Sequence, residues 1–134
     1  RRKQAEIEKR RPAFEKVVAP LEAWAWEDAG ICIRPVRTEE ELADEGSALH
    51  HCVGTYGATV ARGDSCIFFI RRVDAPDKPW FTLQVELKTA KELQNHGLRN
   101  CAPTKEVQEF VDRWIEHVRQ LKVAGKKQKK EAAA

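Results

Sequence analysis

Methionine is missing from this sequence, and long apolar runs are missing as well. The longest apolar run covers only residues 66–70, whereas a membrane-spanning helix needs about 18 apolar residues in a row. We therefore expect no membrane contact. The chain opens with Arg1-Arg2-Lys3, without an initiator methionine or a hydrophobic leader. We expect a cytoplasmic location and a piece of a longer protein.

The cysteines lack the CxxC spacing that is typical of zinc ribbons and redox motifs. Of the four, Cys32 and Cys66 lie in apolar, strand-like runs. This placement favours reduced thiols over a disulfide framework. A zinc site would require distant histidines and cysteines to converge, so we assign no metal ligand and no cofactor.

Neither sign of charge is in large excess over the whole chain, but basic residues are clustered locally. The net charge is only +3, yet basic residues crowd into residues 1–11 and 122–130. Such ends could contact the phosphates of DNA or RNA. The alternative interpretation is a solubilising helix face followed by a frayed tail.

Local patterns predict the helices. Residues 3–18 are rich in helix-forming residues, and Thr38 with Glu41 forms a capping box that begins a helix over residues 39–50. We expect Leu42 and Leu49 to face inward there and Glu45 to face outward. A short helix is expected over residues 56–62. A regular apolar stripe, including Phe110 and Trp114, predicts a buried face on a final helix that begins after Thr104.

Strand patterns occur at residues 31–36, 65–72, 80–87 and 92–96. The last three are joined by short links, which favours an antiparallel meander. We predict an α+β fold: an antiparallel three- to four-stranded sheet with helices packed mainly on one face. The expected organisation is an N-terminal helical segment over residues 1–30, an α+β domain over 31–121, and a basic flexible tail over 122–134.

Two segments concentrate polar chemistry. The first, residues 49–56, reads LHHCVGTY, and the second, residues 93–101, reads LQNHGLRNC. One follows a predicted helix and the other follows a predicted strand. We expect both to meet in one pocket at an end of the sheet.

These segments belong to a longer pattern of spaced residues. The pattern comprises His51-Cys52-Val53-Gly54, Tyr56, Gly63, Ile67, Ile70-Arg71, Pro79, Thr82-Leu83, Gln94, Gly97 and Asn100. It resembles the PcfJ-like family, whose members are associated with conjugative plasmids, phages and other mobile elements. One departure is Gln84, where the family often has an acidic residue. Glu86, on the same strand face, is the candidate substitute.

The resemblance and the polar residues favour a nucleic-acid-associated accessory domain of a mobile genetic element. We expect Gln94 and Asn100 to hydrogen-bond to base edges or to backbone amides, and Tyr56 to stack or hydrogen-bond. Arg71 and Arg99 are the candidate phosphate ligands.

Two further hypotheses stay open. A Cys/His-dependent hydrolase or transferase would use Cys52 as the nucleophile. His51 and His96 are both candidates, but adjacent side chains on a helix diverge, so His96 is favoured as the base over His51. Asn100 or Gln94 would orient it. A protein-interaction module of a larger assembly is the second. Whether the chain is an enzyme is therefore undecided at this point.

Overall fold

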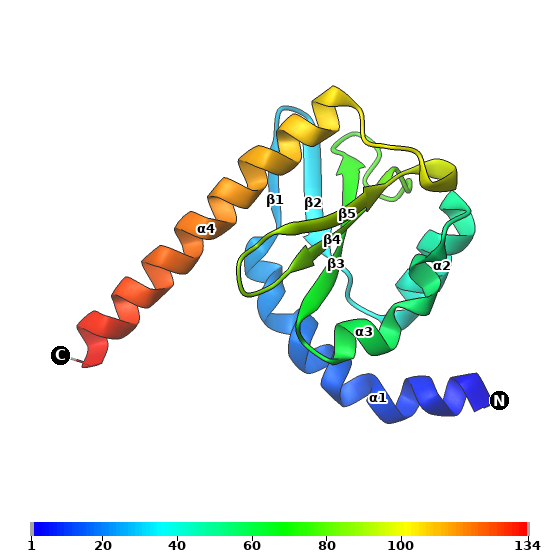
Figure 1. The fold of residues 1–134 in the computed structure, drawn as a ribbon, viewed down its shortest axis with the longest axis horizontal. Coiled ribbons are helices and arrows are strands. Elements are labelled where there is room, and N and C mark those ends of the chain that lie inside the picture. The colour runs from blue at the N-terminus through cyan, green and yellow to red at the C-terminus, as the bar shows by residue number, and fades with distance from the viewer. Residues whose placement is uncertain (1, 134) are drawn as a thin grey trace.

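The computed structural model describes residues 2–133. Its elements are α1 (Arg2–Val18), the 3₁₀ turn η1 (Ala19–Trp24), β1 (Trp26–Asp28), β2 (Ile31–Pro35), α2 (Glu39–Leu49), η2 (Cys52–Thr55), α3 (Gly57–Ala61), β3 (Ser65–Arg72), β4 (Phe81–Glu86), β5 (Glu92–His96), η3 (Leu98–Asn100) and α4 (Lys105–Ala133). Figure 1 shows the sheet at the centre, with α4 on one side of it and α2 and α3 on the other.

The sheet is a five-stranded antiparallel meander in the order β1-β2-β3-β4-β5. The predicted α+β class and the meander are confirmed, with one strand more than expected. The additional strand is β1, which turns back into β2 through Ala29 and Gly30, both at positive φ. Glycine adopts that conformation without steric cost. Residues 26–28 lie in the segment 1–30 that was predicted to be helical, so this strand was not expected.

Helices cover both faces of the sheet, whereas the prediction placed them mainly on one face. Every residue of β3 from Ser65 to Arg71 is buried, and a strand buried on both faces needs a layer on each. Of the predicted helices, α2 and α3 share one face, where Glu45 of α2 contacts Thr82 of β4. The other face belongs to α4, where Trp114 packs edge-on against Phe68 with ring centroids 4.8 Å apart.

Caps and stripes place the helices where the sequence predicts them. The hydroxyl of Thr38 accepts a hydrogen bond from the Glu41 amide at the start of α2, and His50 ends that helix in the left-handed conformation. The predicted stripe on α4 is buried at Val107, Phe110, Val111, Trp114 and Val118. Beyond the sheet, α4 continues as a helix through Ala133 (Figure 1). Lys126, Lys127, Lys129 and Lys130 are exposed there, whereas Lys122 is half-buried and donates to the Leu87 carbonyl.

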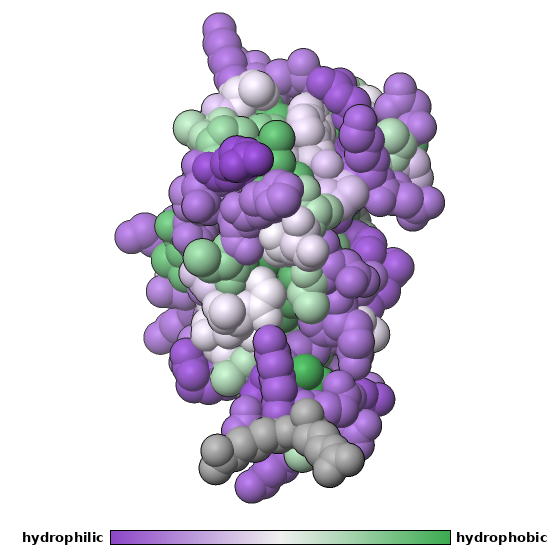
Figure 2. Space-filling model, turned by 90° about the vertical axis from the view of Figure 1, so that its right-hand side faces the viewer, coloured by the Kyte–Doolittle hydropathy of each residue, from purple (hydrophilic) through white to green (hydrophobic). Residues whose placement is uncertain are grey.

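Helix α1 contains Pro12 and packs against α3 at one end of the sheet. Its buried residues Phe14 and Val18 join the main core. Figure 2 views the molecule from the right-hand side of Figure 1, and shows polar side chains over most of this face, with apolar groups in small patches. The division of the chain into residues 1–30, 31–121 and 122–134 stays a prediction.

Candidate functional site

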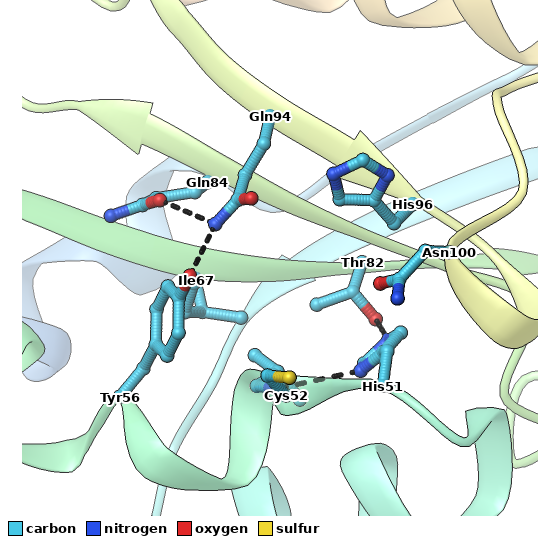
Figure 3. A pocket seen from close by; sticks show the side chains of 10 residues that line it. His51, Cys52, Tyr56, Ile67, Thr82, Gln84, Gln94, His96 and Asn100 are labelled. Atoms are coloured by element: carbon cyan, nitrogen blue, oxygen red, sulfur yellow. Dashed lines mark hydrogen bonds between the residues drawn. The ribbon is translucent and has the colours of Figure 1, made fainter.

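A pocket of about 180 Å³ opens on the sheet face that α2, η2 and α3 cover. It is lined by His51, Cys52, Val53, Tyr56, Ile67, Thr82, Gln84, Gln94, His96 and Asn100. Both polar segments contribute side chains to it, as Figure 3 shows. The prediction that they share one pocket is therefore confirmed, but the pocket lies over a face of the sheet and not at its end.

The first segment reaches the pocket because the chain reverses sharply after α2. Following His50, residues 52–55 form η2, which lies against α2. Gly46 makes this close approach possible: a Cβ atom there would lie 3.0 Å from both the Gly54 nitrogen and the His51 oxygen. Without a side chain at position 46, the η2 backbone rests on the helix and holds His51 and Cys52 over the sheet.

The floor of the pocket comes from alternate residues of β4 and β5. Thr82 pairs with His96, and Gln84 pairs with Gln94, in the antiparallel register. Side chains two residues apart on a strand share a face, so all four point to the same side of the sheet. The short link between β4 and β5 makes these strands antiparallel neighbours, and their pairing brings the four polar side chains together.

Two side chains hold Gln94 in one orientation. Its Nε2 amide donates to the Tyr56 hydroxyl at 2.8 Å and to Gln84 Oε1 at 2.8 Å. Gln84 in turn donates to the Ser65 hydroxyl at 3.0 Å. Both N–H groups of Gln94 are thus engaged, which leaves its carbonyl oxygen available to a ligand. The oxygen turns toward the His96 side of the pocket in Figure 3.

Gln84, which departs from the family pattern, therefore has a clear place in the pocket. Its side chain is the acceptor that orients Gln94. The suggested substitute, Glu86, instead accepts a hydrogen bond from the Thr89 hydroxyl at 2.6 Å, near the β4–β5 turn. Glu86 does not line the pocket, so no carboxylate replaces Gln84 there.

A hydrogen-bonded chain runs from His51 into the core. His51 Nε2 lies 3.0 Å from Thr82 Oγ1, and the Thr82 hydroxyl donates to Glu45 at 2.7 Å. Because His51 Nδ1 accepts from the Val53 amide at 3.4 Å, the proton sits on Nε2 and is donated to Thr82. Burial lowers the pKa of His51, which keeps the ring neutral at pH 7. Both ring nitrogens are therefore engaged within the protein.

Glu45 and Arg71 close this chain as a buried ion pair. The guanidinium donates to both carboxylate oxygens, one of these contacts measuring 3.0 Å, and Glu45 is only 2% exposed. The prediction that Glu45 faces outward is wrong. Arg71 is 7% exposed and paired, so its proposed role as a phosphate ligand is wrong too. The sequence did contain a signal: Leu42, Glu45 and Leu49 follow the helical spacing of one face.

Cys52 is exposed and borders the pocket, but it is not joined to a base. Among residues 2–133, no hydrogen bond connects its sulfur to His51 or His96. His51 is committed to Thr82 and Val53 instead. A nucleophile needs a base within hydrogen-bonding reach, so the geometry favours recognition of a ligand over nucleophilic attack.

The second segment ends in two residues with left-handed backbones. Arg99 and Asn100 have φ values of 53° and 63°, and the turn brings Asn100 to the pocket. Arg99, the residue before Asn100, is exposed and does not line the pocket. Its guanidinium is therefore open to an anionic group.

Other kinds of site were sought in the described part of the chain. Over residues 2–133, no cluster of three or more histidine, cysteine or acidic side chains is placed to hold a metal ion. The four cysteines there are all free. No helix within that range combines the length and apolarity required to cross a membrane.

Alkylation rates should separate the two exposed thiols from the buried thiol of Cys66. Cys52 and Cys101 are exposed and should react with iodoacetamide in the native protein. Cys66 should react only after unfolding, because burial raises its pKa to about 12 and only the thiolate is nucleophilic. Mass spectrometry of the labelled peptides, as a function of pH, measures this. A Cys52 that reacts far faster than Cys101 would revive the nucleophile hypothesis.

Comparison with known proteins identifies relatives of the chain. The family model described as PcfJ-like protein matches residues 1–111. The uncharacterised protein Lin1253/Lin1744 of Listeria innocua is 37% identical over 81 residues, which cover 59% of this chain and 17% of that protein. The match therefore spans only a small part of the relative's length. No solved structure matches significantly.

Proposed function

Since the chain belongs to the PcfJ-like protein family, we propose that it is a nucleic-acid-associated accessory domain of a mobile genetic element. The observation that carries the proposal is the pocket itself, in which the amides of Gln94 and Asn100 converge beside His96. Amide side chains are the usual partners of base edges. The plasmid or phage context comes from the family resemblance.

Charge near the pocket supports the same proposal. Arg99 is exposed next to the rim, and an arginine can bind a phosphate through two hydrogen bonds. Glu45, a carboxylate that would repel phosphate, lies behind Thr82 and is neutralised by Arg71. The pocket floor therefore presents amides, an imidazole and a hydroxyl, but no free carboxylate.

Binding of nucleic acid should weaken steeply with salt, because each neutralised phosphate releases counterions. We expect DNA or RNA oligonucleotides to bind at about 50 mM salt and to bind much more weakly at about 200 mM. Fluorescence anisotropy titrations at both salt concentrations measure this.

The plot of log K against log salt has a negative slope, and Arg99→Ala should reduce the magnitude of that slope by about 1. The matched control is Arg113→Ala, which removes an exposed arginine of α4, on the helix that covers the opposite face of the sheet, where its partner is Asp28. The control should leave the slope unchanged. Absence of binding to any DNA or RNA at low salt would end the proposal.

A further inference from the structure

His96 contributes an unusual feature to the pocket. Its Nδ1 atom is buried and has no hydrogen-bond partner. One nitrogen of a neutral imidazole donates and the other accepts. A buried N–H without a partner is rarer than a buried acceptor without one, so the proton belongs on Nε2. That nitrogen faces the Gln94 side of the pocket in Figure 3.

The pocket wall therefore presents a donor beside an acceptor. The donor is His96 Nε2–H, and the acceptor is the Gln94 carbonyl oxygen, which two hydrogen bonds from its own amide hold in place. Both side chains lie on the same face of β5, two residues apart. The complementary ligand carries an acceptor next to a donor on one planar edge, and such pairs occur on the edges of nucleobases.

Size and lining favour one ring system. Pockets for drug-sized ligands measure about 300–1,000 Å³, whereas this one measures about 180 Å³. It is too small for a base pair. Tyr56, Val53 and Ile67 supply less polar wall, against which the face of a ring can pack. Asn100, at the mouth, offers a second donor and acceptor.

We propose that the pocket receives one unpaired base of a single-stranded nucleic acid, with Gln94 and His96 reading its edge and Arg99 near the adjoining phosphate. This inference rests on the proposed association with nucleic acid and specifies its substrate class. In a duplex the same edge is paired and the base is stacked, so a base would first have to flip out of the helix.

Three labelled probes of equal length test the inference by fluorescence anisotropy. They are a single strand, the corresponding duplex, and a strand with the same phosphates but without bases. Because stacking and reading of one base strengthen binding, the normal strand should bind about tenfold more tightly than the abasic strand. The duplex should bind no more tightly than the abasic strand.

Variants connect this difference to the pocket. Gln94→Ala should remove most of the preference for the normal strand over the abasic strand. The matched control is Gln120→Ala, which removes an exposed glutamine of α4 whose amide contacts only Glu116. It should retain the full preference.

A footprint on the unaltered protein gives an independent result. The normal strand should slow the alkylation of Cys52, which lines the pocket, more than the abasic strand does. Cys101 is also exposed but does not line the pocket, so it reports general coverage.

The outcomes separate the two proposals. Equal binding of all three probes, with Gln94→Ala unaffected and Cys52 unprotected, would overturn the base pocket and leave the nucleic-acid association standing. Failure of every probe to bind at low salt would overturn the association and the base pocket with it.

Discussion

Glu45→Ala should lower the free energy of unfolding by about 3–5 kcal/mol, because it leaves a charge buried without its partner. Arg71 would keep its position in β3 with 7% exposure and no carboxylate to bind. Thr82 would also lose the acceptor of its hydroxyl proton. Urea unfolding followed by tryptophan fluorescence measures the change.

An exposed ion pair of the same chemistry is the control for this prediction. Glu22 pairs with Arg37 at 2.7 Å, and both side chains are more than 40% exposed. Glu22→Ala should change the free energy of unfolding by less than about 1 kcal/mol. The explanation by burial fails if the two variants lose similar stability.

A double replacement tests whether the stability lost in Glu45→Ala comes from the unpaired charge of Arg71. The combination E45L and R71M removes both charges together, so no unpaired charge stays in the core. Replacing a buried ion pair with apolar residues of similar volume is often neutral or stabilising. We therefore expect it to recover most of the stability lost in Glu45→Ala, and to fall short because Thr82 still lacks its acceptor.

Trp114→Ala should also cost about 3–5 kcal/mol, here through a cavity in the core. Trp114 is fully buried on α4, packs against Phe68 and Trp24, and donates its indole N–H to the Trp24 carbonyl at 2.8 Å. The loss is measured from the midpoint and slope of urea unfolding, followed by far-UV circular dichroism.

Val123→Ala provides the comparison on the same helix. Val123 is 67% exposed, and its truncation should change the free energy of unfolding by less than about 0.5 kcal/mol. Trp114 packs on the sheet face opposite the pocket. The folded fraction of Trp114→Ala should therefore keep the probe affinities of the unaltered protein. A selective loss of the single-strand preference would contradict this separation of core and site.

Local sequence patterns predicted much of this fold because they act over a few residues. Thr38 caps α2 through an amide three residues away, and the α4 stripe follows from the helical repeat. The short links between β3, β4 and β5 allowed only an antiparallel meander. From that order of elements, the meeting of the two polar segments in one pocket could also be predicted.

The partners of individual side chains were not predictable in the same way. The residues of the Glu45–Arg71 pair are 26 positions apart, and Tyr56 and Gln94 are 38 apart. Each partner comes from an element whose position relative to the other depends on the whole packed structure. Glu45 was therefore predicted to face solvent and Arg71 to bind phosphate, although the two side chains form an ion pair inside the core.

The amino-acid order was sufficient for the family, the α+β class, most element boundaries and the meeting of the two polar segments in one pocket, because each depends on spacing along the chain. Packing in three dimensions decided which groups in that pocket are free to bind. It commits both nitrogens of His51 and the amide protons of Gln94 to protein partners, and leaves the Gln94 oxygen open. Hydrogen bonds depend on distances and angles between separate elements, which no local pattern encodes.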